Sequence, residues 1–291
     1  MTPQVLLSTV RGSLRRQRLQ TDLVAVGDRV LVTDLGEGEG QIEAILPRQR
    51  VLARLARQTD DVEQVILANP DQALFLFAVR EPTPHRRMLD RFLLLAESRG
   101  LRALIGVNKM DLDGPTDDGQ PSRARQVFGD YEPLYPVHYL SVVCGEGFDR
   151  LREELVGKIT AVAGPSGVGK STVLNHLDPT RQREVGTISG ATGKGRHTTI
   201  ATVLHRLPGE PPTFLADTPG IRSLALQGVN LDELDRLFPE MRPLLGTCFY
   251  PDCTHLHEPN CAVQEGLQAG TIAADRYASY ASLRRGEVAD E

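Results

Sequence analysis

The chain has 291 residues, enough for two or three domains, and its 40% hydrophobic and 24% charged residues are typical of globular proteins. No stretch reaches the ~20 apolar residues that a membrane-spanning helix needs, and the first residues lack the basic segment, apolar core and cleavage site of a signal peptide. The net charge of −5 argues weakly against wholesale binding of nucleic acid. We therefore expect a cytoplasmic protein without a membrane partner.

Residues 1–70 predict a small β-barrel. Apolar stretches at 5–10, 22–35 and 40–47 indicate strands, and glycine-containing turn signals separate them. Because the region contains no Phe, Tyr or Trp, RNA binding there would depend on arginine–phosphate contacts and RNA shape. Two arginine clusters indicate either such contacts or a solvated face; they comprise Arg11, Arg15, Arg16 and Arg18, and then Arg48, Arg50, Arg54 and Arg57.

From residue 71 onward, strands alternate with helices, which predicts a parallel, doubly wound α/β sheet. Ligands of such sheets bind beyond the carboxyl ends of the strands. The motifs described below each follow a predicted strand. The expected strands are 73–79, 102–107, 134–141, 159–163 and 213–216, and the expected helices are 86–99, 148–156 and the segment after Lys170.

Residues 164–171 read GPSGVGKS and fit the phosphate-binding pattern G-x-x-x-x-G-K-[ST] at every fixed position. Lys170 should reach the β- and γ-phosphates, and Ser171 should hold Mg²⁺. The backbone amides of a glycine-rich loop wrap the phosphates. The expected nucleotide contacts are Gly164, Pro165, Ser166, Gly167, Val168, Gly169, Lys170, Ser171 and Thr172. Potassium-activated GTPases carry an asparagine where this chain has Gly167, so we expect no strong potassium requirement.

An Asn-Lys-Met-Asp box at 108–111 predicts recognition of guanine. Asn108 and Asp111 should read the base, because a carboxylate that accepts from guanine N1 and N2 discriminates against adenine. Lys109 should lie over the ring edge. Ser141, in LSVVCGEG, matches the fifth base-contacting loop of GTPases, where Val142 would contact the base through its backbone N–H.

The order of these motifs is inverted relative to an ordinary guanine-nucleotide-binding domain, in which the phosphate loop comes first. Here the base-reading box precedes the phosphate loop, and DTPG follows at 217–220. Asp217 should bind Mg²⁺ through water, and the Gly220 N–H should sense the γ-phosphate. In GRHTT, Thr199 or its neighbour Thr198 should complete the Mg²⁺ shell. The inverted order predicts a circularly permuted GTPase.

The residue that orients the attacking water is not evident near DTPG, where Ile221 follows and the nearest glutamine is the distant Gln227. Intrinsic hydrolysis should therefore be slow. We expect His197 to position the water, with Arg196 as a second candidate; both could instead simply solvate a polar loop.

Three cysteines and a histidine lie within 14 residues near the C-terminus: Cys248, Cys253, His255 and Cys261. Three thiolates and an imidazole suit a closed, tetrahedral, structural Zn²⁺ site. His257 competes with His255 as the fourth ligand, and unconnected thiols are the alternative reading.

Taken together, these motifs resemble the ribosome small-subunit-dependent GTPase A (RsgA) family, as do VGDRV and the RYASYASL tail. The resemblance implies an OB-type β-barrel at 1–70, a circularly permuted α/β P-loop GTPase domain at 71–221 and a mostly helical zinc-binding domain at 222–291. It implies hydrolysis of GTP to GDP during late maturation of the small ribosomal subunit, stimulated by that subunit, with rRNA contacts from the two outer domains. We expect a monomer. The family's barrel usually begins with an additional strand or hairpin, so this barrel is expected to lack its first strand.

Three other interpretations remain open. The phosphate loop also resembles that of guanylate kinases, which would not need the NKMD box or the cysteine cluster. A permuted GTPase acting on the large subunit would share the nucleotide motifs but lack this cluster. A non-hydrolysing RNA-binding switch would be consistent with Ile221.

Overall fold

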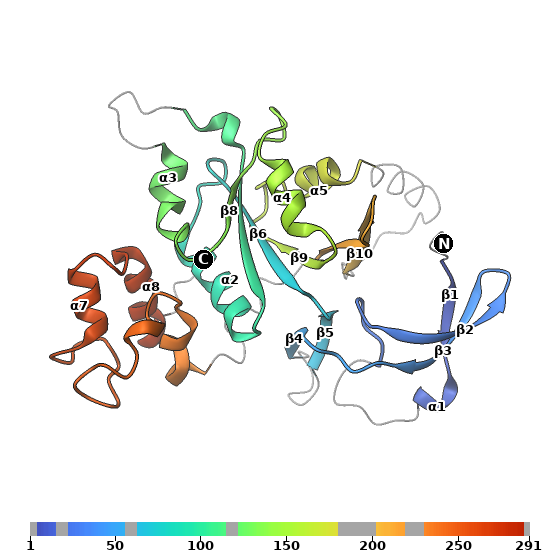
Figure 1. The fold of residues 1–291 in the computed structure, drawn as a ribbon, viewed down its shortest axis with the longest axis horizontal. Helices are drawn as coiled ribbons and strands as arrows, with labels where there is room; N and C mark the ends of the chain where they lie inside the picture. The colour runs from blue at the N-terminus through green and yellow to red at the C-terminus, as the bar shows by residue number, and fades with distance from the viewer. Residues whose placement is uncertain are drawn as a thin grey trace.

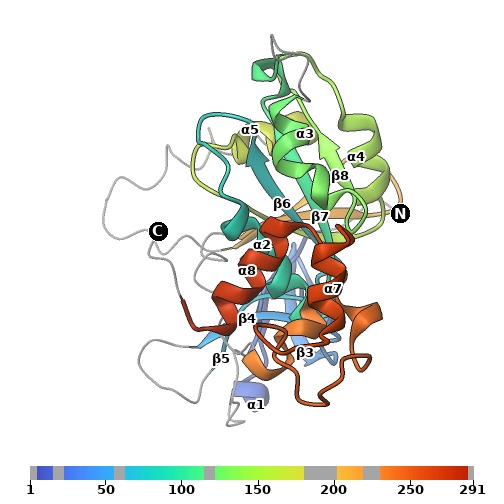
Figure 2. The ribbon, with the colours of Figure 1, turned by 90° about the vertical axis from the view of Figure 1, so that its left-hand side faces the viewer.

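The computed structural model describes residues 5–15, 23–55, 63–114, 122–179, 202–218 and 230–287. A six-stranded sheet lies at the centre, with the N-terminal strands on one side of it and the C-terminal helices on the other (Figures 1 and 2). Its strand order is β10-β11-β9-β6-β7-β8, and every neighbouring pair is parallel except β10 and β11. The strands are β6 (Gln72–Ala78), β7 (Arg102–Asn108), β8 (Val137–Tyr139), β9 (Ile159–Ala163), β10 (Val203–Leu207) and β11 (Thr213–Asp217).

Helices cover both faces of this sheet. On one face α2 (Arg86–Ser98) and α3 (Arg123–Phe128) pack against it, and Phe92 of α2 stacks on Phe75 of β6 with ring centroids 5.3 Å apart. On the other face α4 (Phe148–Leu155) and α5 (Lys170–Leu177) form a second apolar cluster with the strands. Because both faces are covered, β6 is buried along its whole length, as its apolar run predicted.

The predicted strands are confirmed, with two differences in extent. The segment expected to be a strand at 134–141 pairs only over Val137–Tyr139, because Pro136 has no N–H with which to extend the ladder. The segment 22–35 contains a turn before β2 (Val30–Gly36), in which the Asp28 carboxylate accepts from the Ala25 N–H at 2.7 Å.

The N-terminal part contains two small sheets. One has the order β1-β3-β2, with β1 (Leu7–Val10) parallel to β3 (Glu39–Ile45), and a short helix α1 (Gly12–Arg15) follows β1. The other pairs β4 (Val51–Leu55) with β5 (Glu63–Ala68), two strands that the sequence did not predict. Leu52 and Leu67 of this hairpin belong to the same buried cluster as Phe75, so the hairpin packs on the central α/β unit.

The C-terminal part packs on α2. Its elements are η4 (Leu231–Leu237), η5 (Arg242–Leu244), α7 (Ala262–Gln268) and α8 (Ala274–Arg284), and its apolar cluster includes Leu94 of α2. At the junction Arg276 of α8, 1% exposed, donates to Asp90 of α2 at 2.5 Å and to Glu240 at 2.7 Å. Tyr131, at the end of η2 (Gly129–Tyr131), also donates to Asp90. Within the described ranges, no helix has the length and apolar character to cross a bilayer.

Candidate functional site: a guanine-nucleotide site and a metal centre

The predicted nucleotide motifs meet at the carboxyl edge of the central sheet. Asn108 ends β7, Ser141 follows β8, Gly164 follows β9, and Asp217 ends β11. Since these strands are parallel, their carboxyl ends lie at the same edge, which is where ligands of doubly wound sheets bind. Segments separated by up to about a hundred residues of sequence thus form one site.

The phosphate loop has the close backbone packing that glycine permits. A Cβ on Gly164, at φ +155°, would lie 2.1 Å from the Leu76 carbonyl oxygen, and one on Gly169, at φ +90°, would lie 2.6 Å from Asn108 Nδ2. The ammonium of Lys170 donates to the carbonyls of Gly164 at 2.9 Å and Pro165 at 2.7 Å. The lysine therefore lies folded over its own loop at the start of α5, where a phosphate would be held.

Asn108 joins the NKMD box to the glycine-rich loop. Its Nδ2 donates to the Val168 carbonyl at 2.9 Å, while its Oδ1 is buried and without a partner among the described residues. The Asp111 carboxylate accepts from the Ser141 hydroxyl at 2.7 Å, so the loop after β8 orients the carboxylate expected to read the base. Lys109 has a left-handed backbone, φ 63°, which turns the chain between these two side chains.

The loop between β6 and α2 also belongs to this site, and sequence analysis did not identify it. The Val79 N–H donates to the Asn108 carbonyl at 3.0 Å, and the Lys109 ammonium donates to the Glu81 carbonyl. Pro82 lies 3.6 Å from the position that a Cβ on Gly167 would take. No motif marks these residues, because they contribute through their backbone and their place after β6.

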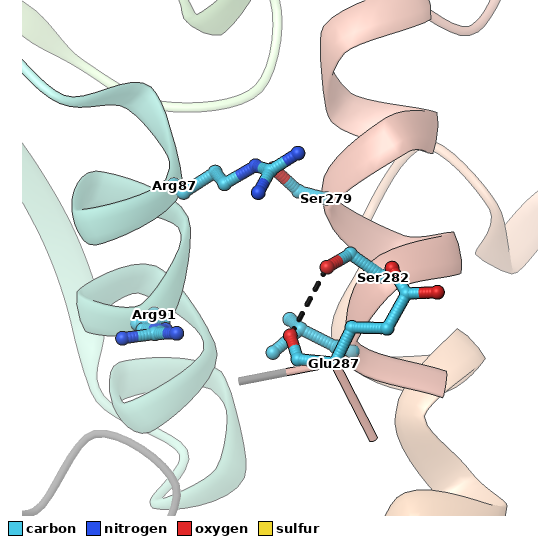
Figure 3. Close-up of a pocket in the computed structure, with 6 residues that line it drawn as sticks. Arg87, Arg91, Ser279, Ser282 and Glu287 are labelled. Atoms are coloured by element: carbon cyan, nitrogen blue, oxygen red, sulfur yellow. Dashed lines mark hydrogen bonds between the residues drawn. The ribbon is translucent and has the colours of Figure 1, made fainter. Parts of the chain in front are cut away.

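Two hollows differ in what they can hold. One of about 620 Å³ lies beside the phosphate-loop helix and the loop after β8, and its lining is Val142, Arg152, Thr172, Asn175, His176 and Pro179. The other lies between α2 and α8, where Arg87 extends toward Ser279, and the Ser282 hydroxyl donates to the Glu287 carbonyl (Figure 3). With about 10 Å³ of space, the second hollow has room for one water molecule at most.

Several predicted site residues lie outside the described residues. They are Arg196, His197, Thr198, Thr199, Gly220, Ile221 and Gln227.

The four predicted metal ligands converge at the C-terminal part of the chain. The ligand atoms of Cys248, Cys253, His255 and Cys261 all lie within 4.8 Å of one another. The sulfur atoms of Cys248 and Cys261 are 3.8 Å apart, and Nδ1 of His255 is 3.5 Å from the first and 3.3 Å from the second. His255 is 3% exposed, whereas His257 points into solvent, so the geometry favours His255 as the fourth ligand.

A carboxylate organises the loop between these ligands. Glu258 accepts from the Thr254 N–H at 2.8 Å and hydroxyl, the Leu256 N–H at 3.0 Å and the His257 N–H at 3.1 Å. Burial alone would raise the pKa of Glu258, but these hydrogen bonds hold that pKa far below its usual range. Glu258 therefore ties together the backbone between the second and the last of the four predicted ligands.

Comparison with known proteins identifies the family of this chain. The family model for RsgA GTPase matches residues 45–227. The chain belongs to the RsgA GTPase family. It is 42% identical, over 95% of its length and 89% of the relative's, to the small ribosomal subunit biogenesis GTPase RsgA of Gemmatimonas aurantiaca. The corresponding protein of Moorella thermoacetica is 39% identical over the same shares.

Two crystal structures superpose on the chain. YjeQ from Thermotoga maritima has a TM-score of 0.76 and 33% identity, covering 98% of this chain and 91% of that one. YloQ, described as a circularly permuted GTPase, has a TM-score of 0.73 and 28% identity, covering 98% and 86%. RsgA GTPases are GTP hydrolases, so this chain is an enzyme with a circularly permuted GTPase fold.

The sheet order of this RsgA-family chain makes the permutation visible. The strand β9, which leads into the GPSGVGKS loop, lies at the centre of the sheet, yet β7 and β8, which lead into the NKMD box and Ser141, precede it in the chain. An ordinary GTPase domain begins with the strand before its phosphate loop, whereas this chain enters the sheet at β6 and reaches that strand, β9, only after β7 and β8. The predicted circular permutation is therefore confirmed.

Proposed function

We propose that the chain binds GTP and Mg²⁺ at the carboxyl edge of the central sheet and hydrolyses GTP to GDP and phosphate during late maturation of the small ribosomal subunit. The observation that carries the nucleotide assignment is the bond from Asn108 to Val168, which joins a guanine-reading box to a phosphate loop. The names of the relatives in Gemmatimonas and Moorella support the ribosomal assignment. Because ribosomal subunits mature in the cytoplasm, we also propose a cytoplasmic location.

The side chains of the site divide the work of binding and hydrolysis. Asp111, held by Ser141, accepts from the base. Lys170 exchanges its loop carbonyls for phosphate oxygens when nucleotide enters. Ser171, Asp217 and, as an expectation, Thr199 would hold Mg²⁺. The bound ion would neutralise negative charge on the β- and γ-phosphates. The remaining proposed contacts are Asn108, Lys109, Val142, Gly164, Pro165, Ser166, Gly167, Val168, Gly169 and Thr172, and Gly220 and His197 stay predicted γ-phosphate and water contacts.

The cysteine cluster fits a structural zinc ion. A tetrahedral ion with Zn–S bonds of ~2.3 Å places its sulfur ligands about 3.8 Å apart, which matches the observed 3.8 Å between Cys248 and Cys261. Three thiolates and one imidazole leave no position for substrate, so we propose that Cys248, Cys253, His255 and Cys261 hold zinc for stability.

We also propose the division into an OB-type barrel at 1–70, a GTPase domain at 71–221 and a zinc-binding domain at 222–291, with rRNA contacts from the outer two. The β-rich N-terminus and the metal-ligand cluster support it. Leu52 and Leu67 of the hairpin β4–β5 pack in the same cluster as Phe75, which is consistent with a junction between the first two domains near residue 70.

Co-sedimentation with purified small ribosomal subunits tests the assignment. With a non-hydrolysable GTP analogue the protein should migrate with small subunits and not with large subunits, and the Lys170→Ala variant should lose the nucleotide dependence. Equal migration with both subunits, or with neither, would overturn the ribosomal part of the proposal. A preference for adenine over guanine nucleotides in a displacement assay would overturn the nucleotide part.

A further inference from the structure

The imidazole of His255 has two different sides. Its Nδ1 faces the sulfur atoms of Cys248 and Cys261 at 3.5 and 3.3 Å. Its Nε2 faces the Asp235 carboxylate of η4 at 3.5 Å, and the two side chains are only 4% and 20% exposed. A ring whose one nitrogen points at soft metal ligands and whose other nitrogen points at a carboxylate has the arrangement of a carboxylate–histidine–metal triad.

The backbone of His255 is fixed independently of Asp235. It lies in the left-handed region at φ 61°, and its carbonyl accepts from the Tyr277 hydroxyl at 2.8 Å and from Gln264 Nε2 at 3.0 Å. Helices α7 and α8 therefore place the residue, but none of these bonds acts on the ring. Among the described residues, Asp235 is the carboxylate in contact with the ring nitrogen that faces away from the thiols.

We propose that Asp235 is a positioning residue for the metal centre: its carboxylate accepts from Nε2–H of His255 and so holds Nδ1 free to bind the ion. This inference rests on the zinc site of the proposed function. The 3.5 Å between Nε2 and the carboxylate oxygen is longer than the ~2.8 Å of a charge-assisted hydrogen bond. A zinc ion on Nδ1 would make the Nε2 proton more positive and would so strengthen its hydrogen bond to the carboxylate.

The same short helix links the metal centre to α2. Leu234, adjacent to Asp235, is fully buried in a cluster with Leu94 of α2. Arg284 of α8 donates to the Leu231 carbonyl at the start of η4. Two adjacent residues of η4 thus face different partners: Asp235 contacts the proposed metal ligand His255, and Leu234 packs with Leu94 of α2. Metal occupancy, acting through Asp235, should therefore stabilise η4 and its packing on α2.

Zinc affinity of the full-length protein tests the proposal, measured by competition with a chromophoric chelator. Asp235→Ala should weaken zinc binding about 10- to 100-fold, the usual effect of removing such a partner. Asp235→Asn keeps an acceptor oxygen and should lose less. The control is Asp232→Ala on the same helix, whose side chain is 87% exposed and pairs with Arg284, and which should leave zinc affinity unchanged. Retained guanine-nucleotide binding shows that each variant is folded.

Amide hydrogen exchange supplies a second readout. Chelation of zinc from the unmodified protein should accelerate exchange over 231–237, and zinc-saturated Asp235→Ala should show the same acceleration while β6 and β7 stay protected. Zinc affinity of Asp235→Ala within about two-fold of the unmodified protein, or exchange over η4 that ignores chelation, would overturn the inference. A purified protein that binds no zinc at all would instead overturn the proposed metal site.

Discussion

Replacing Arg276 by methionine tests how the C-terminal part is held on α2. The change removes one hydrogen bond to Asp90, at 2.5 Å, and two to Glu240, at 2.7 and 3.2 Å. The carboxylates of Asp90 and Glu240, whose side chains are 1% and 5% exposed, would then stay buried without the guanidinium that pairs with them. Removing one partner of a buried ion pair costs about 3–5 kcal/mol, because the other charge stays desolvated. At ~1.4 kcal/mol per factor of ten, amide exchange in α8 should accelerate roughly 100- to 4,000-fold where it proceeds through opening of this region.

Hydrogen exchange read by mass spectrometry over α8 measures this change. The matched control is Arg236→Met, whose side chain is 70% exposed and 3.8 Å from Glu233, and which should change stability by less than about 0.5 kcal/mol. Replacing Arg276, Asp90 and Glu240 together with apolar residues should recover part of the loss, since no buried charge then remains unpaired, although the hydroxyls of Tyr131 and Ser279 lose their acceptor on Asp90. Less than about ten-fold acceleration in Arg276→Met, or no recovery in the triple variant, would mean that the ion pairs of Arg276 do not hold α8 on α2.

Three further predictions concern the nucleotide site and pH. Asp111→Asn should weaken GDP binding about 10- to 100-fold, because an amide replaces a charged acceptor. The same variant should favour xanthosine diphosphate, whose base offers an acceptor to the new amide N–H. Displacement of a fluorescent nucleotide measures both affinities. Gly169→Ala should abolish nucleotide binding because its Cβ would lie 2.6 Å from Asn108 Nδ2 at φ +90°, whereas Gly129→Ala, with nothing within 4 Å, should not. Burial lowers the pKa of His138 below its ordinary value. The contribution of His138 to the free energy of unfolding should therefore be constant above about pH 6.5 and fall as pH drops toward the lowered pKa of the folded state. Urea titrations of His138→Asn should show a shallower fall.

Each of these has a clear contrary result. An Asp111→Asn protein that keeps its preference for GDP would mean that another group reads the base. Equal nucleotide binding by the Gly169 and Gly129 variants would mean that the loop tolerates a methyl group against Asn108. A pH dependence that is identical in His138→Asn would assign the acid loss of stability to other groups.

The sequence predicted the parts of the site whose chemistry is local. The phosphate loop, the NKMD box and the cysteine cluster each concentrate their ligands within a short segment, so spacing alone identifies them. The sequence favoured His255 but left His257 at workable spacing, and the burial of His255 separates the two. The loop after β6 escaped prediction because its contact with Lys109 is made by a backbone carbonyl.

Long-range packing was not predictable either. Arg276 and Asp90 are separated by 186 residues, and nothing in either local sequence announces a buried pair. The arginine in β4, Arg54, interrupts the apolar pattern of the hairpin β4–β5 in the sequence. The pairing of the two strands is also irregular, with a register shift between Leu52 and Ala53. The prediction that the chain alternates strands and helices was confirmed because buried strands of a doubly wound sheet are continuous apolar runs.

The rate of GTP hydrolysis with and without purified small ribosomal subunits, with large subunits as the control, is the decisive test of the proposed function. We expect slow intrinsic turnover, strong stimulation by small subunits, none by large subunits, and loss of both rates in Lys170→Ala. A rate that small subunits leave unchanged, measured under conditions where the protein binds guanine nucleotide, would contradict the proposed role in ribosome maturation.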